Sequence, residues 1–253
     1  MTIESRTYRN EMGEGRFTSF TTGYKDTDLW IGIDPESYLK EMKEFCYERI
    51  KEYRIELENW LSIDPQYGKS LIPYKPSSSC PEMALRMARA AKKAGVGPMA
   101  AVAGAFSERL GNDLKNKFSI QEMAIENGGD IFLLILYPMI LAIYAGNSPL
   151  SGKIGIQIPK ATGRLGVCTS SGTVGPSLSF GKADAVMVAC KDTALADAWA
   201  TALGNLIKSA DDIDKVLKFT ELVEEILSVV VICEGRMGIR GKFEMKIIEG
   251  NRY

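Results

Sequence analysis

Hydrophobic positions in the first third of the chain follow two different periods. Segment 16–33 is rich in β-branched and aromatic residues and is interrupted by a turn near Gly23, which predicts two strands joined by that turn. Apolar residues then recur at three- and four-residue spacing over 39–60, the period of an amphipathic helix. We predict one long helix that begins at Asp34-Pro35, with the carboxylate as its N-cap, and ends before Asp64-Pro65.

Proline and glycine mark the ends of two further predicted helices. Pro81 begins one that runs to Gly95, a residue type typical of a C-cap. Gly97-Pro98 begins the next, which closes near Gly111. Its first half consists almost entirely of Ala, Gly and Val, so we expect another backbone to pack very close to it. The segment 72–80, rich in proline and serine, is expected to form a flexible loop.

Strands and helices alternate irregularly in the rest of the chain. The apolar run 131–145 is expected to fold back at Tyr137-Pro138 into a buried hairpin. The pattern predicts strands within 117–131 and at 153–158, 184–190 and 229–233, helices at 193–208 and 211–227, and a final hairpin around 238–241. This order favours one α+β domain over residues 1–253, with a mixed β-sheet core and packed helices, rather than a doubly wound fold.

Composition excludes several classes of partner. The 31 basic and 32 acidic side chains give a net charge of −1, so no bulk field favours nucleic acid or an anionic membrane. The apolar run 131–145 is shorter than the roughly 20 residues of a membrane span, and the N-terminus is too polar for a signal peptide. Five widely spaced cysteines without CxxC spacing indicate free thiols in a cytoplasmic protein: Cys46, Cys80, Cys168, Cys190 and Cys233.

Chemistry-bearing residues concentrate in 164–205, and the chain contains no histidine. Asp197 and Thr201 lie four positions apart on a predicted helix, so their side chains share one face. A carboxylate and a hydroxyl in this arrangement can hold Mg²⁺, with water and ligand phosphates completing its coordination. The alternative is a solvent-facing aspartate and a threonine bonded back to the helix carbonyl one turn earlier.

Two glycine-containing segments are candidates for contact with an anionic ligand. The first comprises Asn127, Gly128, Gly129 and Asp130, where paired glycines let the backbone approach a ligand closely. An ordinary hairpin turn is the alternative explanation. The second is 95–98, which precedes a predicted helix and could cradle a phosphate at the positive helix end.

A loop of hydroxyl side chains follows Cys168 directly. Its residues supply hydroxyl and amide donors: Thr169, Ser170, Ser171, Gly172 and Thr173. A thiol beside such donors can have a lowered pKa, which would make Cys168 a candidate nucleophile. The alternative is that Cys168 is a small apolar residue that ends a strand.

The segments GVGPMAAVAGA, ENGGDIFL and GVCTSSGTVGPSLSFGKADAV, followed by the ALADAWATAL helix, resemble the ApbE-type flavin transferases. The likeness is greatest to a branch of that superfamily found in archaea and anaerobic bacteria, and it covers about 70–205. It implies an ApbE-like α+β fold, Mg²⁺ held by Asp197 and Thr201, and a flavin nucleotide, FAD or FMN, near the GGD and TSSG loops. The same branch is associated with sulfur assimilation in anaerobes, where Cys168 would be the reactive thiol.

The sequence also departs from the flavin transferases. They carry a histidine and an Asp-Pro-x-x-Gly segment before the metal helix, whereas the corresponding interval here, SLSFGKADAVMV, has neither. Three hypotheses follow: binding of a phosphate-bearing flavin ligand with Mg²⁺, sulfur transfer through a Cys168 persulfide, or a non-catalytic assembly module. The small-residue helices fit packing against a ligand or a second copy of the chain equally well, so the sequence leaves the oligomeric state open.

Overall fold

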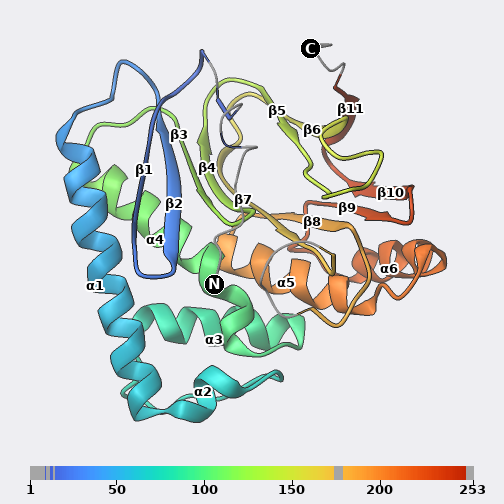
Figure 1. The fold of residues 1–253 in the computed structure, drawn as a ribbon, viewed down its shortest axis with the longest axis horizontal. Helices are drawn as coiled ribbons and strands as arrows, with labels where there is room; N and C mark the ends of the chain where they lie inside the picture. The colour runs from blue at the N-terminus through green and yellow to red at the C-terminus, as the bar shows by residue number, and fades with distance from the viewer. Residues whose placement is uncertain (1–8, 10–11, 14, 174–178, 249–253) are drawn as a thin grey trace.

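The computed structural model describes residues 9, 12–13, 15–173 and 179–248. Figure 1 shows a twisted sheet whose strands are flanked by helices from both halves of the chain. The strands are β1 (Thr18–Tyr24), β2 (Thr27–Ile33), β3 (Met123–Asn127), β4 (Asp130–Ile135), β5 (Met139–Ala142), β6 (Ile154–Ile158), β7 (Gly163–Ser170), β8 (Ala185–Cys190), β9 (Ser228–Cys233), β10 (Arg236–Gly241) and β11 (Glu244–Ile247). The helices are α1 (Glu41–Ile63), α2 (Pro65–Lys69), α3 (Glu82–Ala94), α4 (Val102–Lys117), α5 (Thr193–Leu206) and α6 (Ile213–Phe219).

The strands form two sheets. Eight of them lie in the order β1-β2-β3-β4-β7-β8-β9-β10, and three form a second sheet in the order β11-β6-β5. Every pair of neighbouring described strands is antiparallel. The α+β class is therefore confirmed, but the predicted mixed sheet is wrong. Short turns join several neighbouring strands, and a strand that returns through a tight turn must run antiparallel.

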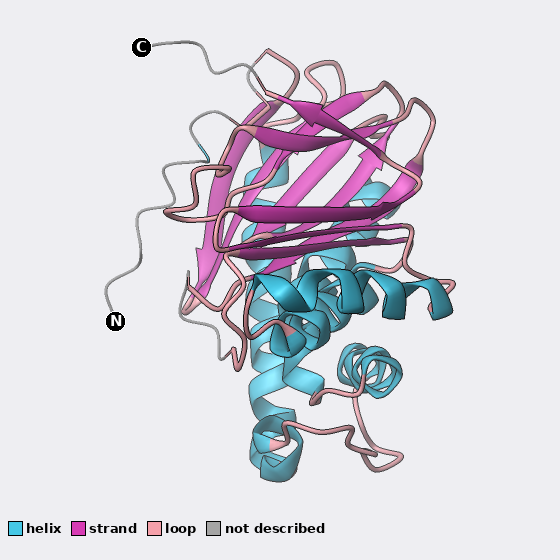
Figure 2. Ribbon diagram, turned by 90° about the vertical axis from the view of Figure 1, so that its right-hand side faces the viewer, coloured by secondary structure: helices cyan, strands magenta, loops and turns pink. Residues whose placement is uncertain are grey.

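Alternate residues of the eight-stranded sheet enter two separate cores. Ile31 and Val188 face the helices, whereas Trp30 and Met187 face the three-stranded sheet. Period-two alternation of this kind is what a sheet buried on both faces requires. The result is three layers, with helices on one face and the small sheet on the other (Figure 2). No described helix is long and apolar enough to cross a membrane.

The long helix ends as predicted but begins later. Its predicted apolar stripe from Met42 to Trp60 is buried, whereas Leu39 is half exposed. The helix starts at Glu41 rather than at Asp34. The Asp34 carboxylate accepts hydrogen bonds from the amides of Ser37, Gln121 and Glu122, and thus ties this loop to the start of β3.

The apolar run 131–145 does not form a hairpin. β4 stays in the large sheet between β3 and β7, while β5 pairs with β6 in the small sheet. The turn at Tyr137-Pro138 therefore carries the chain from one sheet to the other. Glu122, which is buried, accepts hydrogen bonds from the amides of Leu136 and Tyr137 and holds this crossing in place.

Other element boundaries differ from the predictions in length. α3 ends at Ala94 with Gly95 in the left-handed region, as predicted, but α4 continues past Gly111 to Lys117. The predicted helix 211–227 contains a short α6 between 3₁₀ turns. The final hairpin joins β9 to β10 at 234–235, earlier than predicted, and β11 belongs to the small sheet.

Candidate functional site

Helices α4 and α5 cross at a glycine. A Cβ atom placed on Gly104 would lie 2.4 Å from the Thr193 carbonyl oxygen and 2.9 Å from the Asp197 Cβ. On the other side of α5, a Cβ on Gly166 of β7 would lie 2.4 Å from the Thr193 Cα. The close approach predicted from the small residues is thus present, and α5 is wedged between α4 and β7.

At this crossing, each helix provides a carboxylate that accepts a hydrogen bond from a backbone amide in the first turn of the other helix. The Asp197 Oδ2 accepts a hydrogen bond from the Gly104 amide at 2.9 Å, and the Glu108 Oε2 accepts one from the Thr193 amide at 2.7 Å. Each amide lies in the first turn of its helix, where the backbone has no partner of its own and the helix dipole favours negative charge. We call this arrangement the reciprocal cap. It gives Asp197 a structural role that is independent of any metal.

Arg86 of α3 completes the end of the reciprocal cap that contains Glu108. Its guanidinium lies 2.7 Å from both the Glu108 Oε1 and the Asp192 Oδ2. Asp192 is itself the N-cap of α5, accepting a hydrogen bond from the Leu195 amide at 2.9 Å. A charge as buried as that of Glu108 needs such a partner. Three charged residues therefore fix the beginning of the helix that carries Asp197.

Asp197 is only 8% exposed, so it is not the solvent-facing residue of the alternative interpretation. Burial raises its pKa to about 7, although the amides of Gly104 and Ala103 oppose the shift. Burial also raises the pKa of Asp130 well above its ordinary value, and the Asp197 charge adds to this. Thr201 is half-buried one turn after Asp197, on the same face of α5. No described group of three or more His, Cys, Asp or Glu residues is arranged to hold a metal.

The Asn127–Asp130 segment is a two-residue hairpin turn between β3 and β4. Gly128 and Gly129 have φ of +65° and +103°, which suits glycine in a turn of this type. The turn contacts α4 through the Asn127 amide group, which donates to the Ala103 carbonyl at 3.3 Å. Its Gly129 carbonyl accepts a hydrogen bond from the Thr169 amide at 3.1 Å. The segment is a hairpin turn that lies between the hydroxyl loop and α4, and its contact with a ligand stays a prediction.

The hydroxyl loop extends from the end of β7 across α5. A Cβ on Gly204 would lie 3.5 Å from the Ser170 Oγ, so Ser170 lies over the last turns of α5. The Gly172 amide donates to the Ala183 carbonyl, and the Thr173 amide donates to the Ser171 Oγ. The following residues 174–178 of the family-like motif lie outside the described part of the chain.

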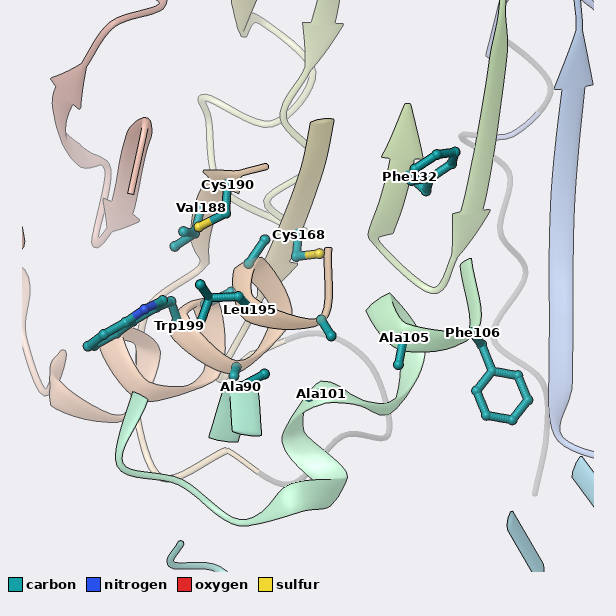
Figure 3. Packing of buried hydrophobic residues seen from close by; sticks show 14 of the residues in the cluster. Ala90, Ala101, Ala105, Phe106, Phe132, Cys168, Val188, Cys190, Leu195 and Trp199 are labelled. Carbon is teal, nitrogen blue, oxygen red and sulfur yellow. The ribbon is translucent and has the colours of Figure 1, made fainter. Parts of the chain in front are cut away.

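Cys168 lies inside the core rather than in a nest of amides. Its Sγ donates to the Thr193 carbonyl at 3.4 Å, and its side chain is fully buried. Burial raises the pKa of the thiol well above its ordinary value, and the charges of Asp130 and Asp197 raise it further. The expected lowering of this pKa is therefore wrong. All five cysteines are free, and Figure 3 shows the sulfur atoms of Cys168 and Cys190 pointing away from each other.

This environment predicts that Cys168 reacts slowly as a nucleophile. At pH 7 we expect iodoacetamide to modify Cys168 much more slowly than the half-buried Cys80, because the thiolate is the reactive form and Cys168 is both less accessible and harder to ionise. Peptide mass spectrometry after timed alkylation measures both rates. Faster labelling of Cys168 would contradict the buried environment and restore the persulfide hypothesis, whose role for Cys168 is otherwise untested.

The predicted phosphate cradle at 95–98 has no space for a phosphate beside Gly97. A Cβ there would lie 1.8 Å from the Ser70 carbonyl oxygen, so the backbone of 70–71 already fills this side. The chain then forms a 3₁₀ turn, Pro98–Ala101, before α4 begins. The first amides of α4 face Asp197 instead. This prediction is wrong because the glycine serves packing.

Sequence reasoning missed the charged residues that support the site. Glu108, Arg86 and Glu126 resemble surface charges in the sequence but have side chains that are mostly buried and paired. One signal was available for Glu108. Gly104 and Glu108 are four residues apart on a helix, as are Thr193 and Asp197, and both pairs occur on the two helices built from small residues.

Comparisons with known proteins show the family to which the chain belongs. The family model described as AbpE bacteria matches residues 9–238. A UPF0280 protein of Methanocaldococcus jannaschii is 38% identical over 223 residues, which cover 86% of this chain and 88% of the relative. The chain belongs to the ApbE-like UPF0280 family. This confirms the predicted relation to an archaeal branch of the ApbE superfamily.

Solved structures extend the relation of this UPF0280 protein to the flavin transferases at the level of the fold. Apo flavinyl transferase ApbE of Pseudomonas stutzeri superimposes with a TM-score of 0.54 at 15% identity, covering 89% of this chain and 94% of its own. A histidine-to-glycine variant of flavin transferase ApbE from Vibrio cholerae gives a TM-score of 0.53 at 13% identity, with 88% and 96% covered. At such identities the likeness establishes the ApbE fold alone.

Proposed function

We propose that this UPF0280 protein binds a phosphate-bearing flavin nucleotide, FMN or FAD, together with Mg²⁺. The observation that carries the proposal is the convergence of three separate motifs on α5. Asp130 pairs with Cys168 across β4 and β7, the Asp130 carboxyl is close enough to Asp197 to feel its charge, and Ser170 lies over Gly204. The shared fold with flavin transferases supports flavin as the ligand class.

The donors available at α5 suit a hard cation. Asp197 contributes carboxylate oxygen and Thr201 contributes a hydroxyl, the ligand types that Mg²⁺ prefers. The Asp197 charge raises the pKa of the buried Asp130, as expected for two carboxyl groups that lie close together in a low-dielectric interior. Mg²⁺ commonly uses one or two protein ligands and completes its shell with waters and phosphates, so a site without three acidic ligands still fits it.

Under this proposal Asp197 and Thr201 would hold the metal, and the hydroxyl groups of 169–173 would contact the nucleotide. Bound Mg²⁺ would supply positive charge to the phosphates. The proposal stops at binding, because transfer of a flavin phosphate to a hydroxyl requires a group that accepts the hydroxyl proton. The flavin transferase of Vibrio cholerae has a histidine that was replaced in the variant described above, whereas this chain has none.

The proposal predicts ligand-linked stabilisation. FMN or FAD with Mg²⁺ at about one hundred times the Kd should stabilise the folded chain by about 3 kcal/mol and raise its Tm. Asp197→Asn should lose this rise, because it removes the charge that holds the metal and keeps an oxygen for the Gly104 amide. Asp26→Asn, the same change at an exposed turn, should retain it.

Differential scanning fluorimetry with each nucleotide, with and without Mg²⁺, makes the measurement. Stabilisation that needs the nucleotide, depends on Mg²⁺ and disappears only in Asp197→Asn supports the site. If FMN and FAD leave the Tm of the wild type unchanged, the proposal fails and the assembly-module hypothesis gains support.

A further inference from the structure

A buried carboxylate lies directly beneath the Asn127–Asp130 turn. Glu126 is the residue before that turn, and its side chain is 1% exposed. Its two oxygens have different partners. The Oε1 accepts a hydrogen bond from the Gly129 amide at 2.7 Å, and the Oε2 accepts one from the Arg9 Nε at 2.6 Å.

Arg9 reaches this carboxylate from the segment before β1. Its guanidinium is 9% exposed and also contacts Asp28 on β2, with the side-chain Oδ2 at 2.6 Å and the backbone carbonyl at 3.0 Å. A buried carboxylate is tolerated only when it is paired and hydrogen-bonded. Arg9 therefore supplies the positive charge that pairs with the buried Glu126 carboxylate under the turn.

Both backbone polar groups of Gly129 are hydrogen-bonded. Glu126 accepts from its amide, and its carbonyl accepts from the Thr169 amide of the hydroxyl loop. The residue has φ +103°, in the left-handed region that glycine adopts readily. Asp130 follows Gly129 directly, at the start of β4.

We propose that Arg9 and Glu126 are positioning residues for the Asn127–Asp130 turn and for the ligand site beside it. The link to ligand affinity rests on the proposed function, whereas the link to the turn does not. Arg9 acts through Glu126, and Glu126 acts through the Gly129 amide. Arg9 is in this way connected to the site, although it precedes in the sequence every motif that resembles the flavin transferases.

The protein contains a matched control for this pair. Arg16 contacts the buried Glu122 at 2.7 Å, just before the opposite end of β3. Glu122 accepts from the amides of Leu136 and Tyr137, away from the Gly129 turn. Removal of Arg16 thus also leaves a buried glutamate without its cation, and separates a general loss of stability from a local effect on the turn.

The experiment compares three variants. They are Arg9→Met, Arg16→Met, and a double variant that carries both Arg9→Met and Glu126→Gln. The glutamine oxygen can accept from the Gly129 amide and needs no cation, so the double variant should restore the turn. Hydrogen–deuterium exchange over 126–131 should be faster than in the wild type for Arg9→Met alone, and the Kd for FMN with Mg²⁺ should weaken about tenfold, the size typical of supporting residues.

Each arm has a distinct outcome. The positioning role is overturned if hydrogen exchange over 126–131 is as slow in Arg9→Met as in the wild type. It is also overturned if Arg16→Met accelerates this exchange as much as Arg9→Met does. If wild type binds no FMN, the proposed function fails while the exchange arm still decides the role of Arg9. Should Arg9→Met not fold, the double variant decides, because fast exchange over the turn in that variant contradicts the rescue expected from the glutamine oxygen.

Discussion

Asp197→Asn is expected to raise the free energy of unfolding of the metal-free protein at pH 8. The variant should also lose much of the increase in this free energy that the wild type shows on acidification. Burial raises the pKa of Asp197 from the ordinary 3.8 to about 7, so the folded chain binds this proton more tightly than the unfolded chain does. Stability from this group therefore increases as the pH falls from about 7 towards 4. A shift of this size corresponds to at most about 4 kcal/mol.

Asparagine separates the two roles of the residue. It removes the buried charge but keeps an oxygen that can accept from the Gly104 amide, so the reciprocal cap survives. Urea unfolding between pH 5 and 8 in the presence of EDTA measures the effect, with Asp26→Asn as the exposed control. If the difference in free energy of unfolding between Asp197→Asn and the wild type does not change with pH, a raised pKa at Asp197 is contradicted.

Gly104→Ala is expected to be the most destabilising methyl addition at the helix crossing. The new Cβ would meet the Thr193 backbone at 2.4 Å and the Asp197 Cβ at 2.9 Å, so α4 and α5 would have to separate. Overpacking of this kind typically costs about 1–3 kcal/mol, and contact with backbone places this site at or above the upper end.

Gly204→Ala is the matched control on the neighbouring helix. A methyl there meets only ordinary contacts at 3.5 Å or more, so the better helix propensity of alanine should leave stability unchanged or raise it by up to about 1 kcal/mol. Chemical denaturation of both variants tests the pair. Equal stability of Gly104→Ala and wild type would show that the crossing can open without loss.

The elements that sequence predicted well are those whose pattern is local. The stripe from Met42 to Trp60 repeats for five turns of α1, and its three- and four-residue period has no other explanation. The start of the same helix was mispredicted because Asp34-Pro35 resembles an N-cap, whereas the Asp34 carboxylate serves amides near residue 121. No local signal identifies a partner that far along the chain.

The candidate site could likewise be predicted only where its residues form a local sequence pattern. Asn127–Asp130, 169–173 and Asp197 could be named as candidates because glycine pairs, hydroxyl runs and helical spacing are visible in the sequence. The structure brings these candidates close together. Cys168 was misjudged in its ionisation, because a thiol at a strand end faces either the loop or the core depending on register, and the register places it in the core. Arg9 and Glu126 were missed because neither residue lies in a sequence pattern that indicates a buried charge.

The reciprocal cap also bears on how related sequences diverge. Gly104, Glu108, Thr193 and Asp197 form one joint in which each helix closes the other's first turn. A larger residue at 104 would move α5 and withdraw the acceptor from the amide that it serves. We expect these four positions to change together in chains that share the joint, so an alignment that scores each column separately would treat one coupled unit as four independent residues.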